Sequence, residues 1–243
     1  MQKNNKVLVS VISPSIRKGA LDIVAKCLKT QFFTNWEWVV STPYKAPFPA
    51  IQAGVTPKGN FFYALNRDLN RCFRKAKGKL IVIILDGVWF PPDLLDNMVA
   101  HYENNPKALV TAVGNQYEFV NGQPTAMVWK DPRIRMDQGS FYRVDYPEME
   151  FCIVSIPRQA ILDCCGLKEA WDLYSASSEK ELCARIEKFG YSLYIDQSIE
   201  YKNSHHERLY GESEWDKHYF EGCKYMEYCM GQVNQGKELL GNL

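Results

Sequence analysis

Polar side chains directly follow three apolar segments in the first half of the chain, and their types suit a ligand site. Residues 13–17 (Ser-Pro-Ser-Ile-Arg) follow the first apolar run, Ser41 and Thr42 follow the second, and residues 86–89 (Asp-Gly-Val-Trp) follow the third. In an open parallel sheet, ligands bind beyond the carboxyl ends of the strands. If the three runs are neighbouring strands, these hydroxyl, guanidinium and carboxylate groups meet at one edge and predict a binding site there.

Acidic residues occur together in the second half, at the start of an expected helix. Glu179 and Glu181 open the segment 179–189, which ends before Gly190. A carboxylate in reach of a hydroxyl can serve as a general base. The alternative is that both acids only favour the positive end of the helix dipole, by about 0.3–1 kcal/mol. From spacing alone, this alternative is the stronger one.

The apolar runs have the character of buried strands. They are rich in β-branched residues and lack polar alternation, as expected of strands covered on both faces. The runs span residues 7–13, 36–41, 80–85 and 109–112. Helical spacing of apolar residues, and Pro92 at a helix start, predict helices over 21–28, 63–76 and 92–104. This order predicts an α/β fold with a mostly parallel sheet flanked by helices.

The second half is predicted to add a hairpin and further helices. Asn121-Gly122 between two alternating segments predicts a type I′ turn. Further helices are expected over 158–164, 179–189 and 214–235, and short strands over 192–195 and 199–201. Residues 130–150 follow no regular pattern. Their first part, residues 130–135, either holds phosphate through its arginines or is an exposed loop.

The overall composition narrows the class of protein. The chain has 243 residues, 46% of them hydrophobic, and a net charge of +1, so it can bury a full core but has no overall field that attracts nucleic acid or acidic lipid. Its eight cysteines show no metal-binding spacing, and we expect reduced thiols. The first apolar run is too short to cross a bilayer. These features predict a cytoplasmic protein without a membrane span.

The order of the segments resembles the inverting family 2 glycosyltransferases with the A-type (GT-A) fold. Residues 11–17 (Val-Ile-Ser-Pro-Ser-Ile-Arg) stand in place of the family's Ile-Pro-Thr-Tyr-Asn-Arg, and residues 35–40 (Asn-Trp-Glu-Trp-Val-Val) are similar to its Trp-Glu-hydrophobic strand. Residues 64–67 (Ala-Leu-Asn-Arg) and 76–78 (Ala-Lys-Gly) are similar to its Ala-Leu-Asn and Ala-x-Gly segments. The match covers most of residues 7–105.

This resemblance implies a Rossmann-like sheet that binds a nucleoside diphosphate sugar. It implies one domain over residues 1–243, with a nucleotide-sugar half (1–113), an acceptor and catalytic half containing the hairpin (114–211), and a carboxyl-terminal helix (212–243). A UDP-sugar is the donor by default and not by deduction, because Thr42 replaces an Asp that the family usually places near uracil and ribose. The residues implied at the donor are Pro14, Ser15, Arg17, Thr42, Asn66, Arg67, Asp86 and Gly87.

The family's Asp-x-Asp motif is incomplete in this chain. Asp86 matches its first acid, but Val88 occupies the place of the second, as in a variant that resembles phage sequences. The resemblance implies Mn²⁺ or Mg²⁺ at the diphosphate, since one protein carboxylate suffices when phosphates supply other oxygens. The implied metal ligands are Asp86 and His206. The alternative is that His205 and His206 form a solvated pair on a loop.

The resemblance also assigns a catalytic base. Residues 178–185 (Ser-Glu-Lys-Glu-Leu-Cys-Ala-Arg) resemble the family's Glu-Asp motif and the helix that follows it. This register places Glu179 on the base, with Glu181 as the reserve candidate. Trp171 and Asp172 fall where the family lines the acceptor side, although a buried Trp is equally common. Trp89 is expected in the donor-site wall or, alternatively, as a core anchor.

The predicted function is therefore transfer of a sugar from a nucleoside diphosphate sugar to an acceptor hydroxyl. The missing second Asp supports an alternative, a protein that keeps the fold and binds nucleotide without turnover. A nucleotidyltransferase ranks last, because residues 13–19 only partly fit a Gly-rich phosphate loop. The acceptor stays open among glycan, lipid-linked sugar, protein and modified DNA base.

Overall fold

A mixed β-sheet organises the molecule. The computed structural model describes residues 8–47, 49–57, 59, 63–174, 177–204, 212–237 and 240–243. Its ten strands follow the order β3-β2-β1-β4-β9-β6-β10-β5, and β7 and β8 pair with β6 and β10. The strands are β1 (Val9–Pro14), β2 (Trp36–Ser41), β3 (Ile51–Gln52), β4 (Leu80–Ile84), β5 (Val88–Trp89), β6 (Ala108–Val120), β7 (Gln123–Trp129), β8 (Phe141–Val144), β9 (Ile153–Pro157) and β10 (Ser192–Ser204).

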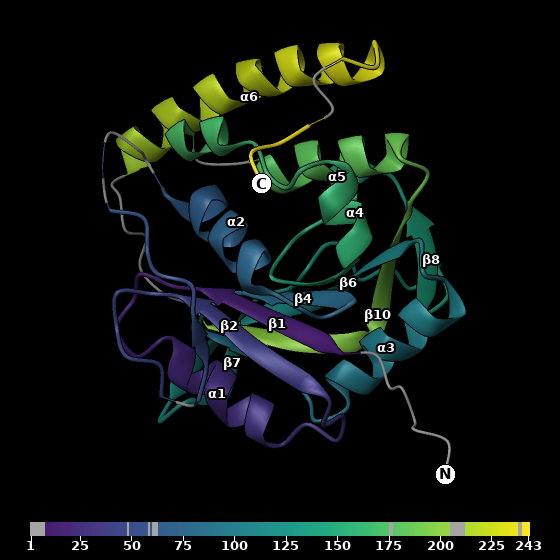
Figure 1. Cartoon of the computed structure of the whole chain (residues 1–243). Helices are drawn as coiled ribbons and strands as arrows, with labels where there is room; N and C mark the ends of the chain where they lie inside the picture. Colours follow the sequence, from purple (N-terminus) through teal and green to yellow (C-terminus); the bar gives the residue numbers. More distant parts are fainter. Residues whose placement is uncertain are drawn as a thin grey trace.

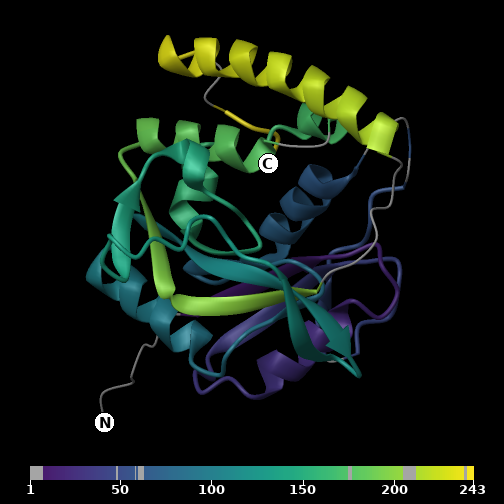
Figure 2. The same ribbon diagram turned by 180° about the vertical axis from the view of Figure 1, so that it is seen from behind.

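Helices cover both faces of this sheet, as the α/β prediction requires. In Figure 1, α1 and α3 lie below the sheet, while α2, α4 and α5 lie above it; the reverse view in Figure 2 agrees. The long helix α6 crosses the outside of α5 and forms a further layer. The helices are α1 (Leu21–Lys29), α2 (Leu65–Lys75), α3 (Leu94–Asn104), α4 (Arg158–Asp163), α5 (Ser178–Lys188) and α6 (Glu212–Asn234), with 3₁₀ turns η1 (Tyr146–Glu148) and η2 (Glu169–Leu173).

The core divides into two clusters, one on each face. Val24 and Leu28 of α1 pack with Met98 of α3 under the sheet, and Phe73 of α2 packs with Ile186 of α5 above it. The central strand β4 is fully buried, which explains its continuous apolar sequence. In the part of the chain that the structure describes, no helix is both long enough and apolar enough to cross a bilayer.

The parallel half of the sheet confirms the strand prediction closely. β1 pairs in parallel with β2 and with β4, so Ile12 lies between Val39 and Ile83. The hairpin prediction is confirmed as well. Asn121 and Gly122 have φ angles of 54° and 75°, the positive values that a type I′ turn needs at both central positions.

The second half departs from the prediction in its strands. β6 runs without interruption through the first arm of the hairpin, and β10 joins the two short strands that were expected separately, with an irregular register between Asp196 and Glu200. β9 was not predicted. It enters antiparallel between β4 and β6, so the sheet is mixed at its centre. Helix α3 begins at Leu94, two residues after the expected start at Pro92.

The segment at residues 76–78 shows why a glycine precedes β4. The Gly78 N–H donates to Ser10 Oγ at 2.7 Å, and the Lys77 N–H donates to Glu37 Oε1 at 2.6 Å. A Cβ on Gly78 would lie 2.5 Å from the Ser10 backbone nitrogen and 2.7 Å from the Leu8 carbonyl oxygen. Both are backbone atoms of the adjacent segment, residues 8–10, which a rotamer change cannot move away.

We expect Gly78→Ala to destabilise the fold by about 1–3 kcal/mol, the usual cost of overpacking. Urea denaturation followed by circular dichroism measures this change. Gly139→Ala is the matched control, because a Cβ there meets no atom within 4 Å. Equal midpoints for the two variants would contradict the close approach of the chain to β1.

Candidate active site

The carboxyl ends of β1 and β4 bring three predicted residues into contact. Ser15 Oγ donates to Asp86 Oδ2 at 2.6 Å, and Arg17 Nη1 donates to Asp86 Oδ1 at 3.2 Å. The Arg17 backbone N–H also donates to Ser15 Oγ at 3.1 Å. The side chains of Arg17 and Asp86 keep 29% and 12% of their exposure. We call these three residues the edge cluster, and they place a guanidinium at the surface of the sheet edge.

The other predicted residues of this edge support the cluster through backbone contacts. Pro14 ends β1, and the next N–H, of Ser15, donates to the Ser41 carbonyl at 2.9 Å. Thr42 is buried, and its Oγ1 accepts a hydrogen bond from the Tyr44 N–H at 3.3 Å. Gly87 has φ of 71°, a conformation that favours glycine. Its N–H donates to the Ala20 carbonyl at 3.1 Å, and its carbonyl accepts from the Ser204 N–H at 2.9 Å. The chain turn after β4 is thereby fixed.

Trp89 lies farther along the same edge, on β5. It pairs with Lys202 of β10, whose Nζ lies 5.2 Å from the centroid of the Trp89 ring and 5.2 Å from that of Tyr117. This cation–π arrangement fixes one face of the indole. The Trp89 side chain is half-buried, so it is neither a fully exposed residue of the donor site nor a fully buried core residue.

The described residues do not by themselves fit a divalent cation. Asp86 offers one carboxylate, which Ser15 and Arg17 already engage, and Val88 at the second acidic position is fully buried. Within the described ranges, no group of three or more His, Cys, Asp or Glu side chains is placed to hold a metal ion. His205 and the predicted ligand His206 lie outside the described residues. The cation that the structure does bring to Asp86 is Arg17.

The predicted base Glu179 lies in the first turn of α5. Burial raises the pKa of its carboxyl, and the nearby Glu150 carboxylate raises it further, whereas Lys180 and a weak hydrogen bond from Ser178 partly offset this effect. The preceding residue, Ser177, has φ of 79°, a strained value for a residue other than glycine. A carboxylate with a raised pKa is a stronger base and is suited to accept a proton.

Segment 150–152 contacts the end of β4 and interacts electrostatically with Glu179. The Leu85 N–H donates to the Cys152 carbonyl at 2.9 Å, which places this segment beside the residue that precedes Asp86. Burial raises the pKa of the Cys152 thiol to about 11, and the carboxylates of Glu150 and Glu179 contribute to the shift. Glu150 and Cys152 were missed as site residues. The apolar segment that contains Cys152, residues 151–157, was the available signal for a strand that begins at the site.

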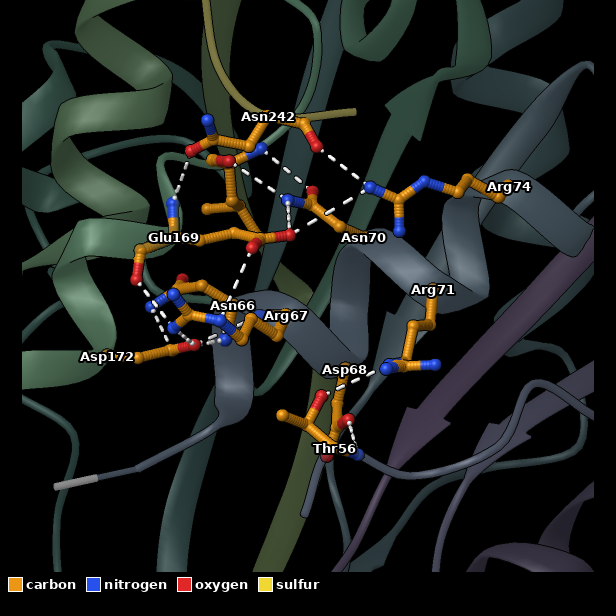
Figure 3. A network of polar contacts seen from close by, with 11 residues as sticks. Thr56, Asn66, Arg67, Asp68, Asn70, Arg71, Arg74, Glu169, Asp172 and Asn242 are labelled. Atoms are coloured by element: carbon orange, nitrogen blue, oxygen red, sulfur yellow. Dashed lines mark hydrogen bonds and ion pairs between the residues drawn. The ribbon is translucent and has the colours of Figure 1, made fainter. Parts of the chain in front are cut away.

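A second set of predicted site residues forms an internal network instead (Figure 3). Asp172 Oδ1 accepts hydrogen bonds from the backbone N–H and the side-chain amide of Asn66, at 2.8 and 2.9 Å. Arg67 donates to Asp172 Oδ2 from its backbone at 3.2 Å and from Nη1 at 2.8 Å. Asp172 has no exposed surface and caps the start of α2. We therefore assign these residues a structural role and leave them out of the proposed site.

Trp171 and Glu181 are also buried. Trp171 is 1% exposed and packs against Tyr225 of α6, with ring centroids 4.8 Å apart. Glu181 has no exposed surface; Arg185 Nε donates to it at 2.9 Å, and Lys168 Nζ lies 3.3 Å away. Glu181 cannot reach a substrate hydroxyl from this position. This finding removes it as the reserve base, and Trp171 as an acceptor contact.

Known proteins similar to this chain are found through structure. No protein-family model matches the chain, and no curated protein matches its sequence. GalNAc-T7, crystallised with UDP, GalNAc and Mn²⁺, matches with a TM-score of 0.64 at 13% identity, over 83% of this chain and 44% of that one. The chain has the fold of the GT-A glycosyltransferases.

A second GT-A structure agrees with the first. *S. aureus* TarS (residues 1–349) with UDP-GlcNAc matches with a TM-score of 0.57 at 12% identity, over 82% of this chain and 59% of that one. The same protein with UDP gives a TM-score of 0.56 at 11% identity. The chain thus spans about half the length of the GT-A structures that it matches. At such identities the likeness concerns the fold.

Proposed function

We propose that this GT-A chain is a glycosyltransferase that moves a hexose from a nucleoside diphosphate sugar, by default a UDP-sugar, to an acceptor hydroxyl with inversion. The observation that supports the proposal is segment 150–152, whose Cys152 carbonyl accepts from the Leu85 N–H beside Asp86 and whose Glu150 and Cys152 interact electrostatically with Glu179. On this proposal, Arg17 supplies the cation for phosphate and Glu179 the base for the hydroxyl. GalNAc-T7 and TarS, which share the fold, were crystallised with UDP.

In the proposed reaction, the acceptor oxygen attacks the anomeric carbon on the face opposite the diphosphate. The bond from that carbon to the diphosphate oxygen breaks, and its electron pair leaves with the diphosphate. The acceptor proton passes to the Glu179 carboxylate. Arg17, held by Asp86, offers guanidinium N–H groups to the departing phosphate oxygens, a pairing that suits their planar geometry.

A divalent cation bound at the diphosphate would supply additional positive charge to the leaving group. The Mn²⁺ of the GalNAc-T7 structure belongs to that protein. Because the described residues of this chain do not fit such an ion, no step above depends on one. Whether Mn²⁺ or Mg²⁺ strengthens nucleotide binding is a separate arm of the test below.

We expect Arg17→Ala to weaken UDP binding about tenfold to a hundredfold, since a hydrogen bond to a charged group contributes about 1.5–3 kcal/mol. Isothermal titration calorimetry with UDP measures this, once with EDTA and once with Mn²⁺. Lys18→Ala is the control, because Lys18 is exposed and next in sequence. Equal UDP affinity of the two variants in EDTA would contradict the phosphate role of Arg17.

The second candidate function is a nucleotide-binding protein of the same fold without turnover, and the buried Val88 in place of the second acid favours it. A measurement of turnover distinguishes the two candidates. A panel of nucleoside diphosphate sugars is first ranked by thermal shift, because a ligand at a hundred times its Kd adds about 2.7 kcal/mol of stability. Donor hydrolysis or transfer is then followed by NMR of the sugar product, whose anomeric configuration reports inversion. UDP binding without turnover on any donor would favour the second candidate.

A further inference from the structure

A cavity of about 250 Å³ opens beside segment 150–152. It lies against the middle of β6 and the carboxyl-terminal ends of β7 and β10, in the half of the chain that carries Glu179. None of the residues discussed so far as donor contacts lines it. Its main polar and aromatic lining residues are Gln116, Trp129, Arg133, Glu150, Tyr201 and Asn203.

Three of these side chains form one row across neighbouring strands. Trp129 of β7 is paired with Gln116 of β6, and Gln116 is paired with Asn203 of β10. Paired residues of adjacent strands project from the same face of a sheet. The row therefore presents an indole ring and two carboxamides toward the same cavity.

The wall of the cavity is held rigid without any ligand. Asp131 is 2% exposed; its Oδ2 accepts from the Gly114 N–H at 3.0 Å and from Arg133 Nη2 at 2.6 Å. Its own N–H donates to Asn115 Oδ1 at 2.9 Å. Arg133 and neighbouring N–H groups hold the pKa of the Asp131 carboxyl below its usual value, although burial opposes them. Such internal bonding preorganises a binding surface.

The floor of the cavity depends on a close contact between β6 and β10. The Tyr201 ring lies directly against Gly114, where a Cβ would come within 1.9 Å of Tyr201 Cε2. Tyr201 is only 3% exposed. Glycine at this position leaves room for the Tyr201 ring, because any Cβ there would overlap it.

The chemistry of the lining selects a small hydroxylated ring. The Trp129 side chain is 46% exposed and offers an apolar face, whereas the exposed Glu150 carboxylate and the two carboxamides are hydroxyl partners. The volume of about 250 Å³ lies below the about 300–1,000 Å³ typical of pockets for larger ligands and suits a single ring. The Asp131–Arg133 pair is neutral overall, so with Glu150 the cavity has no excess positive charge for an anion.

We propose that this cavity binds one neutral hexopyranose ring, as the sugar subsite of the reaction. The proposal rests on the proposed function, because the place of the cavity at segment 150–152 gives the ring its role. Trp129 packs against the apolar face of the ring, and Glu150 accepts from its hydroxyls. The ring belongs either to the donor sugar or to the terminal sugar of the acceptor.

The test compares Trp129→Ala and Glu150→Gln with the unaltered protein. Val128→Ala is the matched control, because Val128 is 47% exposed on the same strand and does not line the cavity. The half-exposed Trp129 and the size-matched Glu150→Gln are chosen so that both variants fold, which circular dichroism verifies. Calorimetry measures UDP and a set of UDP-hexoses, and saturation-transfer NMR measures free hexoses and N-acetylhexosamines in the presence of UDP.

We expect both cavity variants to bind UDP normally and to lose about tenfold in affinity for the ring. A loss confined to the UDP-hexose assigns the ring to the donor, and a loss of the free-sugar signal assigns it to the acceptor. Either result supports the subsite. Unchanged sugar binding in both variants, or no sugar binding by the unaltered protein, overturns the subsite, while intact UDP binding leaves the proposed function standing. An unaltered protein that binds no UDP overturns both.

Discussion

Glu179→Gln is expected to lower the rate of sugar transfer by about 10²–10⁴-fold, the usual contribution of a general base. The amide keeps the size of the side chain but accepts no proton. UDP affinity should stay unchanged, because Glu179 is separate from the edge cluster. Initial rates with a saturating donor measure the effect. Glu103→Gln is the matched control, since Glu103 is an exposed glutamate on α3.

The pH dependence provides a second readout of the same residue. The base works only when it is deprotonated, and its pKa is raised in the fold. Activity should therefore fall, as the pH is lowered, at a higher pH than for an ordinary glutamate. The same shift means that ionising Glu179 costs stability; this cost grows as the pH rises above its pKa in the unfolded chain and is complete above its pKa in the fold. Glu179→Gln should consequently be at least as stable as the unaltered protein at pH 7, and a rate loss accompanied by unfolding would contradict the catalytic role.

Asp172→Ala is expected to destabilise the fold by about 3–5 kcal/mol, because it leaves several donors without an acceptor and each buried one costs about 1–3 kcal/mol. The substitution leaves Arg67 without its partner at 2.8 Å and frees two backbone N–H groups at the start of α2 (Figure 3). Burial raises the pKa of the Asp172 carboxyl in spite of these donors. The donors therefore do not fully offset the cost of burying the charge, and the ion pair itself adds little to the free energy of unfolding. The cost arises from the donors left unsatisfied. Denaturation by urea measures it.

Asp96→Ala is the control for this substitution, because Asp96 is an exposed acid in the first turn of α3 and should change stability by no more than about 0.5 kcal/mol. A double-mutant cycle with Arg67→Ala isolates the coupling between the two side chains. Additive effects of Asp172→Ala and Arg67→Ala would show that the network in Figure 3 does not act as a unit.

The fold could be predicted well wherever local patterns decide the structure. Apolar runs and turn residues located β1, β2, β4 and the type I′ hairpin, because these elements depend on periodicity and on residues such as Gly122 that adopt positive φ. β9 was missed since it follows an irregular stretch and its partners, β4 and β6, are remote in sequence. Strand order at the centre of the sheet is a tertiary property that no local window contains.

The candidate site shows the same division. Ser15, Arg17 and Asp86 meet as expected, because the ends of parallel strands share one edge. Asp172 and Glu181, in contrast, have the right residue type in the right place along the chain but are fully buried. A sequence pattern does not distinguish a carboxylate that faces substrate from one that faces an internal arginine. Only the direction of the side chain separates the two roles.

The antiparallel strand β9 has a consequence for the order in which the molecule can fold. Residues 153–157 leave the ribosome after β6 but must lie between β4 and β6. A nascent chain that ends at the hairpin therefore contains both neighbours of a strand that does not yet exist. The centre of the sheet can close only once the later segment has been synthesised, and long-range pairing of this kind makes folding slow. Until then, the exposed edges of β4 and β6 are the part of the growing chain that most needs protection from aggregation.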